Sequence, residues 1–508
     1  MFVKTLFSLG LGVAAAAKYA ASNTTSATRL DQLPTLSAGA DCACGQLAAQ
    51  FGNSLLTTNS TNYTVQAQDY YDIRAVLAPK CIFLPNDAAE VASGMAILAS
   101  CGAQFAIRAV GHMNFPGAND IDGGVVLALN NLKDIQVSPD NKTVQVGPGN
   151  QWVDVYSALD AYDLYCIGGR MKTIGVSGLS LIGGFHYLTN KYGFAMDNVV
   201  SYDVVLGNGT QVVANATSNP DLFWALKGGA NNFGVVTKFV LKTLPIHQVS
   251  TTLQVFNESY IREFIDATVD LTKSQDPSIG AGSIITISYN TTTKSMTAVL
   301  RGVQEGTESP PSSFQKFSEL PSTLTQNVVQ KPLEFHDQLD SPFQMFRIQF
   351  GHKTIKPDAD QIYRIYEAWK AAVEDISDVE GLIPTLVLNT MASSAMSVAK
   401  NNGIGNVWGL DDKEPLIIWQ TSTGWDNAAS DLRVTNFARG VLDELHAENQ
   451  AKGLASEFLY MGDASEFQDP FLGFPAENVQ KMKDVRSLYD PLDVFTRQNW
   501  GGFKLPRI

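Results

Sequence analysis

The residue best placed to do chemistry in this sequence is a histidine in a glycine-containing loop. In residues 107–120, IRAVGHMNFPGAND, His112 directly follows Gly111 after a short apolar run, and the 508-residue chain has only six histidines. An imidazole can act as an acid, a base or a ligand near neutral pH. The residues alone leave two interpretations open: a loop built to hold His112 against a bound group, or a hydrogen-bonded loop histidine.

Two glycine-rich stretches follow, at residues 175–198 (GVSGLSLIGGFHYLTNKYGFAMDN) and 227–239 (KGGANNFGVVTKF). Glycines let the backbone approach a flat or anionic ligand and aim N–H groups at it. The spacing of Gly175 and Gly178 invites comparison with a dinucleotide-binding fingerprint. That fingerprint needs a strand before it and a long helix after it, and neither is evident here. The two stretches therefore indicate either a backbone that passes close to a bound ligand without forming this fingerprint, or glycines that serve only turns.

Composition narrows the classes of partner. The chain carries 50 acidic and 36 basic residues, a net charge of −14, and no Lys/Arg cluster. Nucleic acids and anionic membranes normally require a basic face, so we expect neither, and no apolar stretch after the N-terminus is long enough to span a bilayer. We expect a monomer that binds a small molecule. No CxxC pair occurs, so no metal site is expected.

The N-terminus and the cysteines indicate a secretory protein, secreted or held in a vesicle or vacuole. Residues 1–22 resemble a signal peptide, with a basic start, a short apolar run and small residues at a cleavage site. Eight Asn-x-Ser/Thr sequons fit this route. There are five cysteines, so at least one stays unpaired, and we expect Cys42 and Cys44 to pair with Cys81 or Cys101 rather than with each other.

The patterning predicts an α+β protein in several parts. Residues 23–67 are rich in Ser, Thr and Asn and are interpreted as an N-terminal extension that wraps the first domain. Residues 68–245 alternate strands, turns and helices, with a hairpin turn at Asn208-Gly209. Residues 246–465 predict a second α+β domain, an antiparallel sheet covered by helices, in which EGTESPPSSFQKF is an exposed connection. Residues 466–508 are expected to pack back onto the first domain.

Four motifs, in this order, carry a resemblance to a known family: RAVGH; GVSGL…GG…YGFAMDN; PDLFWALKGGANNFGVVTKF; and YDPLDVF…GGFKLP. They resemble signatures of the FAD-linked oxidoreductases of the vanillyl-alcohol oxidase superfamily, especially the berberine-bridge-enzyme-like proteins of fungal secondary metabolism. The resemblance implies a two-part PCMH-type FAD-binding domain made from both ends of the chain. It also implies that the isoalloxazine ring faces the substrate domain.

The resemblance also implies which residues bind the cofactor. In the family the histidine of the first motif is joined covalently to the 8α-methyl of the flavin, and here it is His112. Many members have a second bond through a cysteine, but the matching residue is Met171, and Cys166 lies five residues early. A thioether cannot act as a thiolate, so one covalent bond is predicted. Val110 and Ile182 replace glycines usual in the family. The other predicted cofactor-binding residues are Arg108, Gly111, Gly175, Gly178, Gly183, Gly184, Tyr192, Asn198, Gly229, Asn232, Gly234, Val235 and Asn499.

Catalytic residues are expected on FLYMGDASEFQD, which is similar to a strand that passes over the flavin in the family. Tyr460 and Asp463 are the candidate bases, and His186 is a third candidate because it follows a glycine pair where a small residue is common. The resemblance implies an FAD-dependent oxidase or dehydrogenase that takes a hydride from a small secondary metabolite and passes electrons to O₂, with ring formation as a coupled step. The alternatives are a redox-neutral cyclase or pericyclase that keeps FAD as a platform, a carbohydrate oxidase, and a non-catalytic FAD-binding protein.

Overall fold

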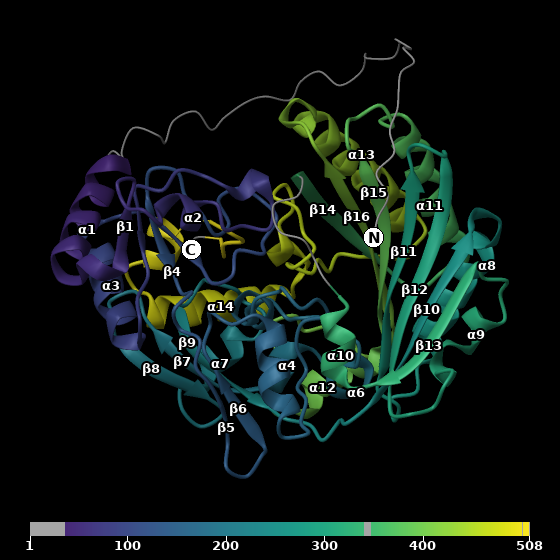
Figure 1. Cartoon of the computed structure of the whole chain (residues 1–508), viewed down its shortest axis with the longest axis horizontal. Helices are drawn as coiled ribbons and strands as arrows, with labels where there is room; N and C mark the ends of the chain where they lie inside the picture. Colours follow the sequence, from purple (N-terminus) through teal and green to yellow (C-terminus); the bar gives the residue numbers. More distant parts are fainter. Residues whose placement is uncertain (1–35, 340–346, 500, 507–508) are drawn as a thin grey trace.

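The protein is described here from a computed structural model that covers residues 36–339, 347–499 and 501–506. Three β-sheets with surrounding helices make up the fold (Figure 1). Two smaller sheets belong to the first half of the chain, and one large antiparallel sheet belongs to the second half. The α+β class predicted from the sequence is confirmed. No helix in the described ranges is both long enough and apolar enough to cross a membrane.

The first sheet has the strand order β1 (Leu55–Thr57), β2 (Cys81–Phe83), β4 (Val125–Ala128), β3 (Phe105–Arg108). Strand β1 is antiparallel to β2, and the other neighbours are parallel. Helices α1 (Leu36–Phe51) and α3 (Ala88–Cys101) pack against each other beside it, and α2 (Tyr63–Ala67) precedes β2. The described part of the predicted N-terminal extension is therefore not a simple tether, because it supplies a helix and an edge strand of this domain.

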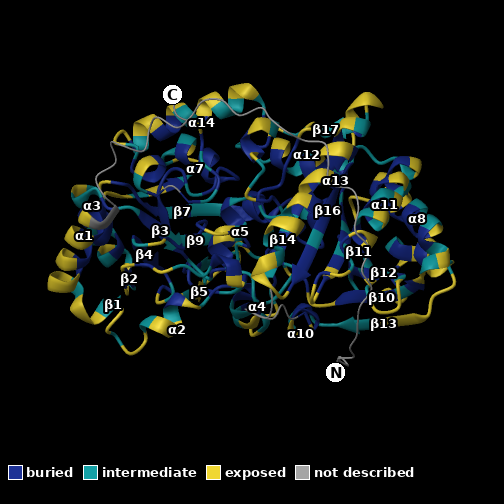
Figure 2. Ribbon diagram, turned by 90° about the horizontal axis from the view of Figure 1, so that it is seen from above, coloured by how far each residue is buried: buried dark blue, intermediate teal, exposed yellow. Residues whose placement is uncertain are grey.

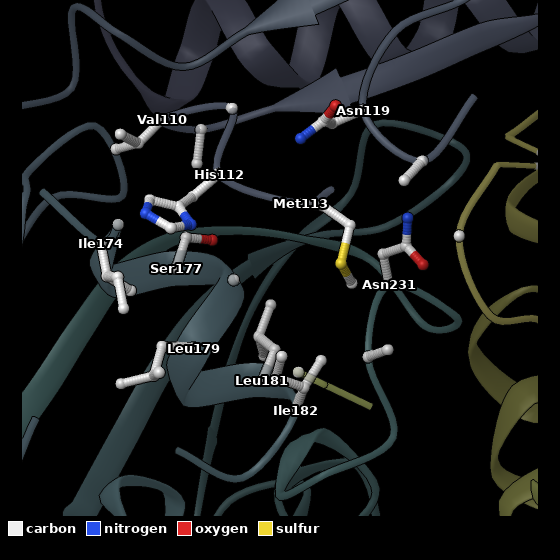
Figure 3. Close-up of a pocket in the computed structure, with 18 of the residues that line it drawn as sticks. Val110, His112, Met113, Asn119, Ile174, Ser177, Leu179, Leu181, Ile182 and Asn231 are labelled. Carbon is white, nitrogen blue, oxygen red and sulfur yellow. The ribbon is translucent and has the colours of Figure 1, made fainter. Parts of the chain in front are cut away.

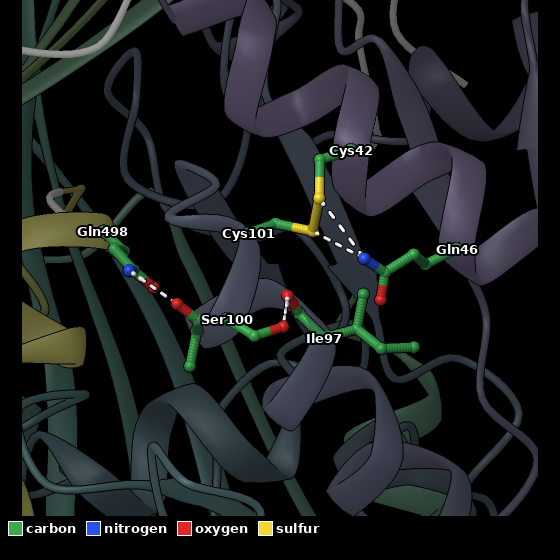
Figure 4. The surroundings of a disulfide bond; sticks show 7 residues. Cys42, Gln46, Ile97, Ser100, Cys101 and Gln498 are labelled. Carbon is green, nitrogen blue, oxygen red and sulfur yellow. Dashed lines mark hydrogen bonds between the residues drawn. A yellow bond between two sulfur atoms is a disulfide. The ribbon is translucent and has the colours of Figure 1, made fainter.

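Two disulfide bonds fasten α1 to its neighbours. Cys42 pairs with Cys101 at the end of α3 (Figure 4), and Cys44 pairs with Cys81 in β2. The Gln46 amide lies against the first bond, 3.4 Å from both sulfur atoms. Cys166 is a buried free thiol. The prediction that Cys42 and Cys44 each form a disulfide bond with Cys81 or Cys101 is confirmed.

The second sheet is antiparallel, with the order β5 (Ile135–Val137), β6 (Thr143–Val146), β9 (Val235–Lys242), β7 (Val199–Val205), β8 (Gln211–Asn215). The predicted turn at Asn208-Gly209 joins β7 to β8, and Gly209 has φ +83°, a conformation that favours glycine. Around this sheet lie α4 (Trp152–Asp160), α5 (Val176–Leu181), α6 (Thr189–Tyr192) and α7 (Pro220–Leu226), the last with its predicted proline at the first turn.

The third sheet has eight strands in the order β13 (Leu324–Gln330), β10 (Val249–Asn257), β12 (Ser295–Glu305), β11 (Ala281–Asn290), β15 (Ile383–Met391), β16 (Leu416–Trp425), β14 (Arg347–Ile355), β17 (Ala455–Ser456). Strand β12 alternates buried and half-buried residues, as a sheet with two unlike faces requires. Helices α8 (Ile261–Ser274), α11 (Ala359–Glu374) and α13 (Asp431–Ala451) pack on the sheet and on each other. Their outer faces are exposed and their inner faces buried (Figure 2).

One connection in this domain differs from the sequence interpretation. The segment EGTESPPSSFQKF is exposed from Thr307 to Pro310, but its second half forms a short helical turn and α9 (Gln315–Ser318). Phe314 and Phe317 in that half are fully buried in the core between the sheet and its helices. The spacing of the two phenylalanines could have predicted this buried turn, because apolar rings three residues apart fall on one side of a helical turn.

The C-terminal segment lies among elements of the first half of the chain, where Figure 1 shows it in yellow beside the purple and blue elements. Helix α14 (Ala476–Tyr489) packs on α7. The Asn232 amide holds the last described residues, since it donates to the Phe503 carbonyl at 3.1 Å and accepts from the Leu505 N–H at 3.0 Å. The remaining helices α10 (Pro332–Asp337) and α12 (Ser393–Asn401) lie near α4 and α6, at the junction between the two halves.

Candidate active site

A cavity of about 290 Å³ lies between the His112 loop and the large sheet. It is lined mainly by apolar residues and glycines (Figure 3). Ile284 of β11 and Phe350 of β14 contribute from the large sheet, and Phe503 contributes from the C-terminal segment. The polar side chains of the lining are His112, Asn119, Arg170, Ser177, Asn231, Tyr460 and Asp463.

His112 lines this cavity from the loop that follows β3. Its ring stacks on Tyr71, with centroids 4.1 Å apart and planes 12° apart. In Figure 3 the imidazole lies beside Ser177. Burial lowers the pKa of His112 to about 4, so the ring is neutral at physiological pH and one nitrogen keeps its lone pair. The histidine is thus presented at the cavity, as predicted, in the form that could act as a nucleophile.

The glycines at the cavity differ in whether protein atoms pack against them or whether they face open space. Gly111 has φ +84°, and a Cβ there would lie 2.7 Å from the Asp69 carbonyl oxygen. Gly178, in α5, is different: a Cβ built there meets nothing within 4 Å, so its backbone faces open space. Gly178 and Gly175 line the cavity together with Gly234 and Val235. Of these residues Gly178 leaves room along the cavity wall for a flat ring, whereas a Cβ at Gly175 or Gly234 would meet Val110 or Val204.

Two asparagines supply polar groups to the cavity. Asn119 has a buried Oδ1 with no hydrogen-bond partner among the described residues, an arrangement that is costly unless a bound group donates to it. Asn231 accepts from the Lys504 ammonium at 3.1 Å through Oδ1. That contact leaves the Asn231 N–H groups as donors toward a ligand. A wall with a neutral histidine, an open position at Gly178 and an unpaired acceptor fits the isoalloxazine ring of FAD, which is flat and carries both donors and acceptors.

The other predicted cofactor-binding residues do not line this cavity. Arg108 donates to Gln66 and lies over the Tyr70 ring. Tyr192 donates to Glu305, and Asn198 donates to the carbonyls of Tyr192 and Phe194, so both stabilise their own surroundings. These contacts place the three side chains among protein partners outside the cavity, and their predicted contact with the cofactor stays a prediction.

The remaining glycines and one asparagine are also placed elsewhere. Gly183 packs on Trp408, where a Cβ would lie 2.0 Å from the ring, while Gly184 (φ +86°) and Gly229 are close to neighbouring protein atoms. Asn232 holds the C-terminal segment, as described above. Asn499 is fully buried, and neither atom of its amide has a partner among the described residues. Asn499 therefore keeps an unmet hydrogen-bonding capacity that a bound cofactor could satisfy.

Tyr460 and Asp463 both line the cavity. Burial raises the pKa of Asp463 to about 6, and the nearby Arg170 works in the other direction. Burial also raises the pKa of Tyr460, and the Asp463 charge raises it further. Asp463 is therefore largely ionised at neutral pH and can take a proton, whereas Tyr460 stays protonated and can only donate or accept a hydrogen bond.

Sequence reasoning missed two residues beside Asp463. The Arg170 guanidinium donates from Nη1 to Asn389 Oδ1 at 2.8 Å, and the Asn389 amide donates from Nδ2 to Asp463 Oδ2 at 3.0 Å. Arg170 lines the cavity. Arg170 directly precedes Met171, the position matched to the family's flavin-linking cysteine, and this neighbour could have indicated that it lies at the site. Asn389 lies in β15, and no local sequence pattern marks it as a site residue.

His186 does not lie in the cavity lining, contrary to expectation. It is buried, and its Nδ1 accepts from the Leu188 N–H at 3.1 Å. Its Nε2 lies 2.7 Å from the Tyr165 hydroxyl, which also bonds His336 Nε2. Burial, and then His336, holds the pKa of His186 well below its usual range. It belongs to a buried aromatic cluster behind the cavity and is not placed to touch a substrate.

The residues discussed for a second flavin bond occupy different places. Met171 lines the cavity, and Cys166 is fully buried outside its lining, in the cluster that contains Tyr165. Burial raises the pKa of the Cys166 thiol, which makes it a poor nucleophile. No group of three metal-binding side chains occurs within the described part of the chain.

Comparisons with known proteins agree with this architecture. Residues 79–215 match the model of an FAD-binding domain. The chain is 32% identical over 480 residues to the FAD-dependent monooxygenase prx3 of Penicillium roqueforti, covering 91% of this chain and 93% of that protein.

Solved structures share the fold. Xylooligosaccharide oxidase from Myceliophthora thermophila C1 superimposes with a TM-score of 0.74 at 19% identity, covering 93% of this chain and 99% of that one. Glucooligosaccharide oxidase from Acremonium strictum, studied for its 6-S-cysteinyl, 8α-N1-histidyl FAD, superimposes with a TM-score of 0.73 at 18% identity, covering 89% and 97%.

Fold, cavity and relatives together define an FAD-dependent oxidoreductase. The chain belongs to the family of fungal FAD-dependent oxidoreductases that includes prx3, as the FAD-linked family predicted from its four motifs requires. It shares its fold with a berberine-bridge-enzyme-like protein of Physcomitrella patens, at a TM-score of 0.72 and 19% identity.

Proposed function

We propose that the protein oxidises a small secondary metabolite by hydride transfer from a C–H bond to FAD, with O₂ as the electron acceptor. The observation that carries this proposal is the ionisable carboxyl of Asp463, buried in a mainly apolar cavity that His112 also lines. A base with a pKa of about 6 suits proton removal at neutral pH, and proton removal from a hydroxyl makes the adjacent C–H bond a better hydride donor.

The residues that would hold FAD are those of the first-domain wall: His112, Gly111, Gly178, Asn119 and Asn231. When bound, FAD supplies a two-electron acceptor for hydride and a group that O₂ can reoxidise. The large sheet closes the other side with Ile284 and Phe350, apolar side chains that exclude water from the reacting atoms.

Asp463 acts as the general base in this proposal, and Tyr460 orients the substrate. The Asn389 N–H fixes Asp463 Oδ2, so the proton is taken by the other carboxyl oxygen. Tyr460 packs edge-on against Phe185 and Trp408, which hold its ring in one orientation. Because its phenol stays protonated, Tyr460 can donate a hydrogen bond to a substrate oxygen.

We further propose that His112 carries a single covalent bond to the flavin. The neutral imidazole and the thioether of Met171 at the cavity support one bond rather than two. The wild-type protein should keep the mass of one FAD after acid precipitation, and His112→Ala should lose it while still binding FAD in its native state. Intact-protein mass spectrometry and flavin absorbance measure both. Release of FAD from the denatured wild type would refute the bond.

Anaerobic incubation with candidate metabolites tests the function itself. The expected result is bleaching of the flavin absorbance together with a product two hydrogens lighter, or its cyclised isomer. Product formation with no bleaching would replace hydride transfer by redox-neutral cyclisation. Peroxide formation with oligosaccharides would establish a carbohydrate oxidase, which two similar structures are named for. At 18–19% identity those structures support the fold alone.

A further inference from the structure

The large antiparallel sheet ends in an open edge strand. Strand β13 pairs with β10 on one side, and no strand of the described residues pairs with its other side. Its first four residues, from Leu324 to Asn327, are exposed, and its last three are half-buried. Figure 2 shows the strand at the rim of the molecule. A strand in this position presents a row of backbone N–H and C=O groups that can pair with another strand.

The other sheet edges are protected by their short length. The first sheet ends in β1 and β3, of three and four residues, and the second in β5 and β8, of three and five residues. The far edge of the large sheet is β17, of two residues. Short edge strands offer few groups for pairing. With seven residues, β13 is the longest edge strand of the described sheets.

Strand β13 also lacks the features that commonly block pairing at an edge. No charged residue and no proline lies between Ser322 and Gln330, although the whole chain has a net charge of −14. The register with β10 runs from Val249↔Gln330 to Val255↔Leu324 without a β-bulge. Lysines, prolines and bulges are the usual means of blocking an edge. Because none is present, a second strand meets neither a missing N–H group nor a like charge.

One side-chain hydrogen bond shows which peptide groups of β13 face outward. Thr251 of β10 donates from Oγ1 to the Val328 carbonyl at 3.0 Å, so the peptide groups of Val328 point toward β10. Peptide groups alternate in direction along a strand. Those of Thr325, Asn327 and Val329 therefore point away from the sheet, and these three residues supply the open row of donors and acceptors.

We propose that β13 is a dimerisation surface, and that its partner is β13 of a second copy of this chain, paired antiparallel about a twofold axis at Asn327. In this register Asn327 lies opposite the same residue of the second copy, and Thr325 lies opposite Val329. Each of these pairs exchanges two backbone hydrogen bonds, which gives about six in all. The two eight-stranded sheets then form one continuous sheet.

The strand itself favours a second copy over a charged peptide. A charged peptide finds no opposite charge on β13, whereas an identical strand brings none. Thr325 and Val329 are both β-branched, and such residues suit neighbouring positions on paired strands. Each copy offers one such edge, so the contact uses the same surface on both chains and closes at two.

This inference is independent of the proposed function, because no residue of β13 lines the cavity. It differs from the monomer expected from composition, since composition does not show which strand ends at a sheet edge.

The mass of the holoenzyme in solution tests the inference. Sedimentation equilibrium is measured between about 1 and 200 µM, a range suited to a small interface. The average mass of the wild type should rise from one chain toward two. Asn327→Pro should stay monomeric, since it removes an outward N–H and no hydrogen bond to β10. Asn327→Ala, the matched control, keeps the N–H and should dimerise like the wild type.

Both variants should keep the melting temperature and the flavin content of the wild type. Asn327→Lys serves as a second variant in case proline disturbs the strand. It places two like charges opposite each other at the twofold axis and should weaken the dimer about fivefold at low salt. In the wild type, added salt should strengthen the dimer, because it screens the net negative charge of the two chains while β13 itself is uncharged.

Cysteine cross-linking tests the register. Asn327→Cys places two Cα atoms about 5.5 Å apart across the axis, within the range of a disulfide bond. Leu324→Cys, at an exposed residue of the same strand, places them about 20 Å apart. Mild oxidation should therefore link the first variant into a dimer on non-reducing electrophoresis and leave the second as single chains. The free thiol of Cys166 is buried and takes no part.

Three results would each overturn the inference. The first is a wild type that stays monomeric over the whole concentration range, whatever other segment the edge then binds. The second is an Asn327→Pro variant that dimerises as the wild type does. The third is equal cross-linking of the two cysteine variants. A dimer that weakens as salt is added would also overturn it, because that dependence requires ion pairs that β13 does not contain.

Discussion

Asp463→Asn is expected to lower kcat/KM by about 10²- to 10⁴-fold, the usual contribution of a general base. The amide is nearly isosteric but cannot take a proton. In the wild type, kcat/KM should fall as the pH drops below about 6, because protonation of Asp463 removes the base. The acid limb of the pH–rate profile, measured by steady-state kinetics with an identified substrate, checks both statements.

Stability separates a catalytic role of Asp463 from a structural one. Burial disfavours the ionised carboxyl, so its raised pKa means that this charge costs folding free energy above about pH 6. The asparagine variant should therefore unfold at the same temperature as wild type or a higher one. Glu457→Gln, which removes an exposed carboxylate near His446, is the matched control and should keep full activity. Wild-type kinetics in Asp463→Asn would contradict the assignment.

Arg74→Met is expected to lower the free energy of unfolding by about 3–5 kcal/mol, the cost of leaving a buried ion partner unpaired. The Arg74 side chain is 5% exposed and bonds the carboxylates of Asp72 and Glu466, each at 2.9 Å. It also donates to the backbone carbonyls of Asn114 and Ile348, at 2.7 and 2.6 Å. These partners come from both halves of the chain and from the C-terminal segment, so the arginine joins the parts that enclose the cavity.

Asn114 lies two residues after His112, so Arg74→Met should also reduce the flavin content of the purified protein. Chemical denaturation and the ratio of flavin to protein absorbance measure the two effects. The control is Arg433→Met, which breaks a bidentate pair with Asp378 whose side chains are 45% and 69% exposed. An exposed pair contributes about 1 kcal/mol or less. Equal destabilisation in both variants would contradict the special role of Arg74.

The sequence predicted the local elements that have strong patterns. The hairpin at Asn208-Gly209, the helix that begins at Pro220 and the alternation of β9 follow from turn chemistry and periodicity, which act over a few residues. The segment of Phe314 and Phe317 was wrongly predicted to be exposed, because the prolines and serines before it are typical of a loop. Both rings are buried in a core that forms only when the whole domain folds.

Among the predicted site residues, too, local motifs predicted some positions correctly and tertiary packing decided others. His112, Gly175, Gly178, Gly234, Tyr460 and Asp463 were predicted from motifs and do line the cavity. His186 was expected there as well, but tertiary packing turned it toward Tyr165 and His336. Motif position reports where the backbone runs, and the direction of a side chain depends on which partners the rest of the chain brings to it.

By itself, the sequence determined the fold class, the family and the loop that presents His112, because each depends on residues close together in the chain or on motifs in a fixed order. Only the tertiary structure decided what stands beside Asp463. Arg170, Asn389 and Asp463 come from three distant segments, and their hydrogen bonds exist only once the large sheet closes over the first domain. The charge, pKa and partner of a buried group are properties of its surroundings, and no local pattern encodes them.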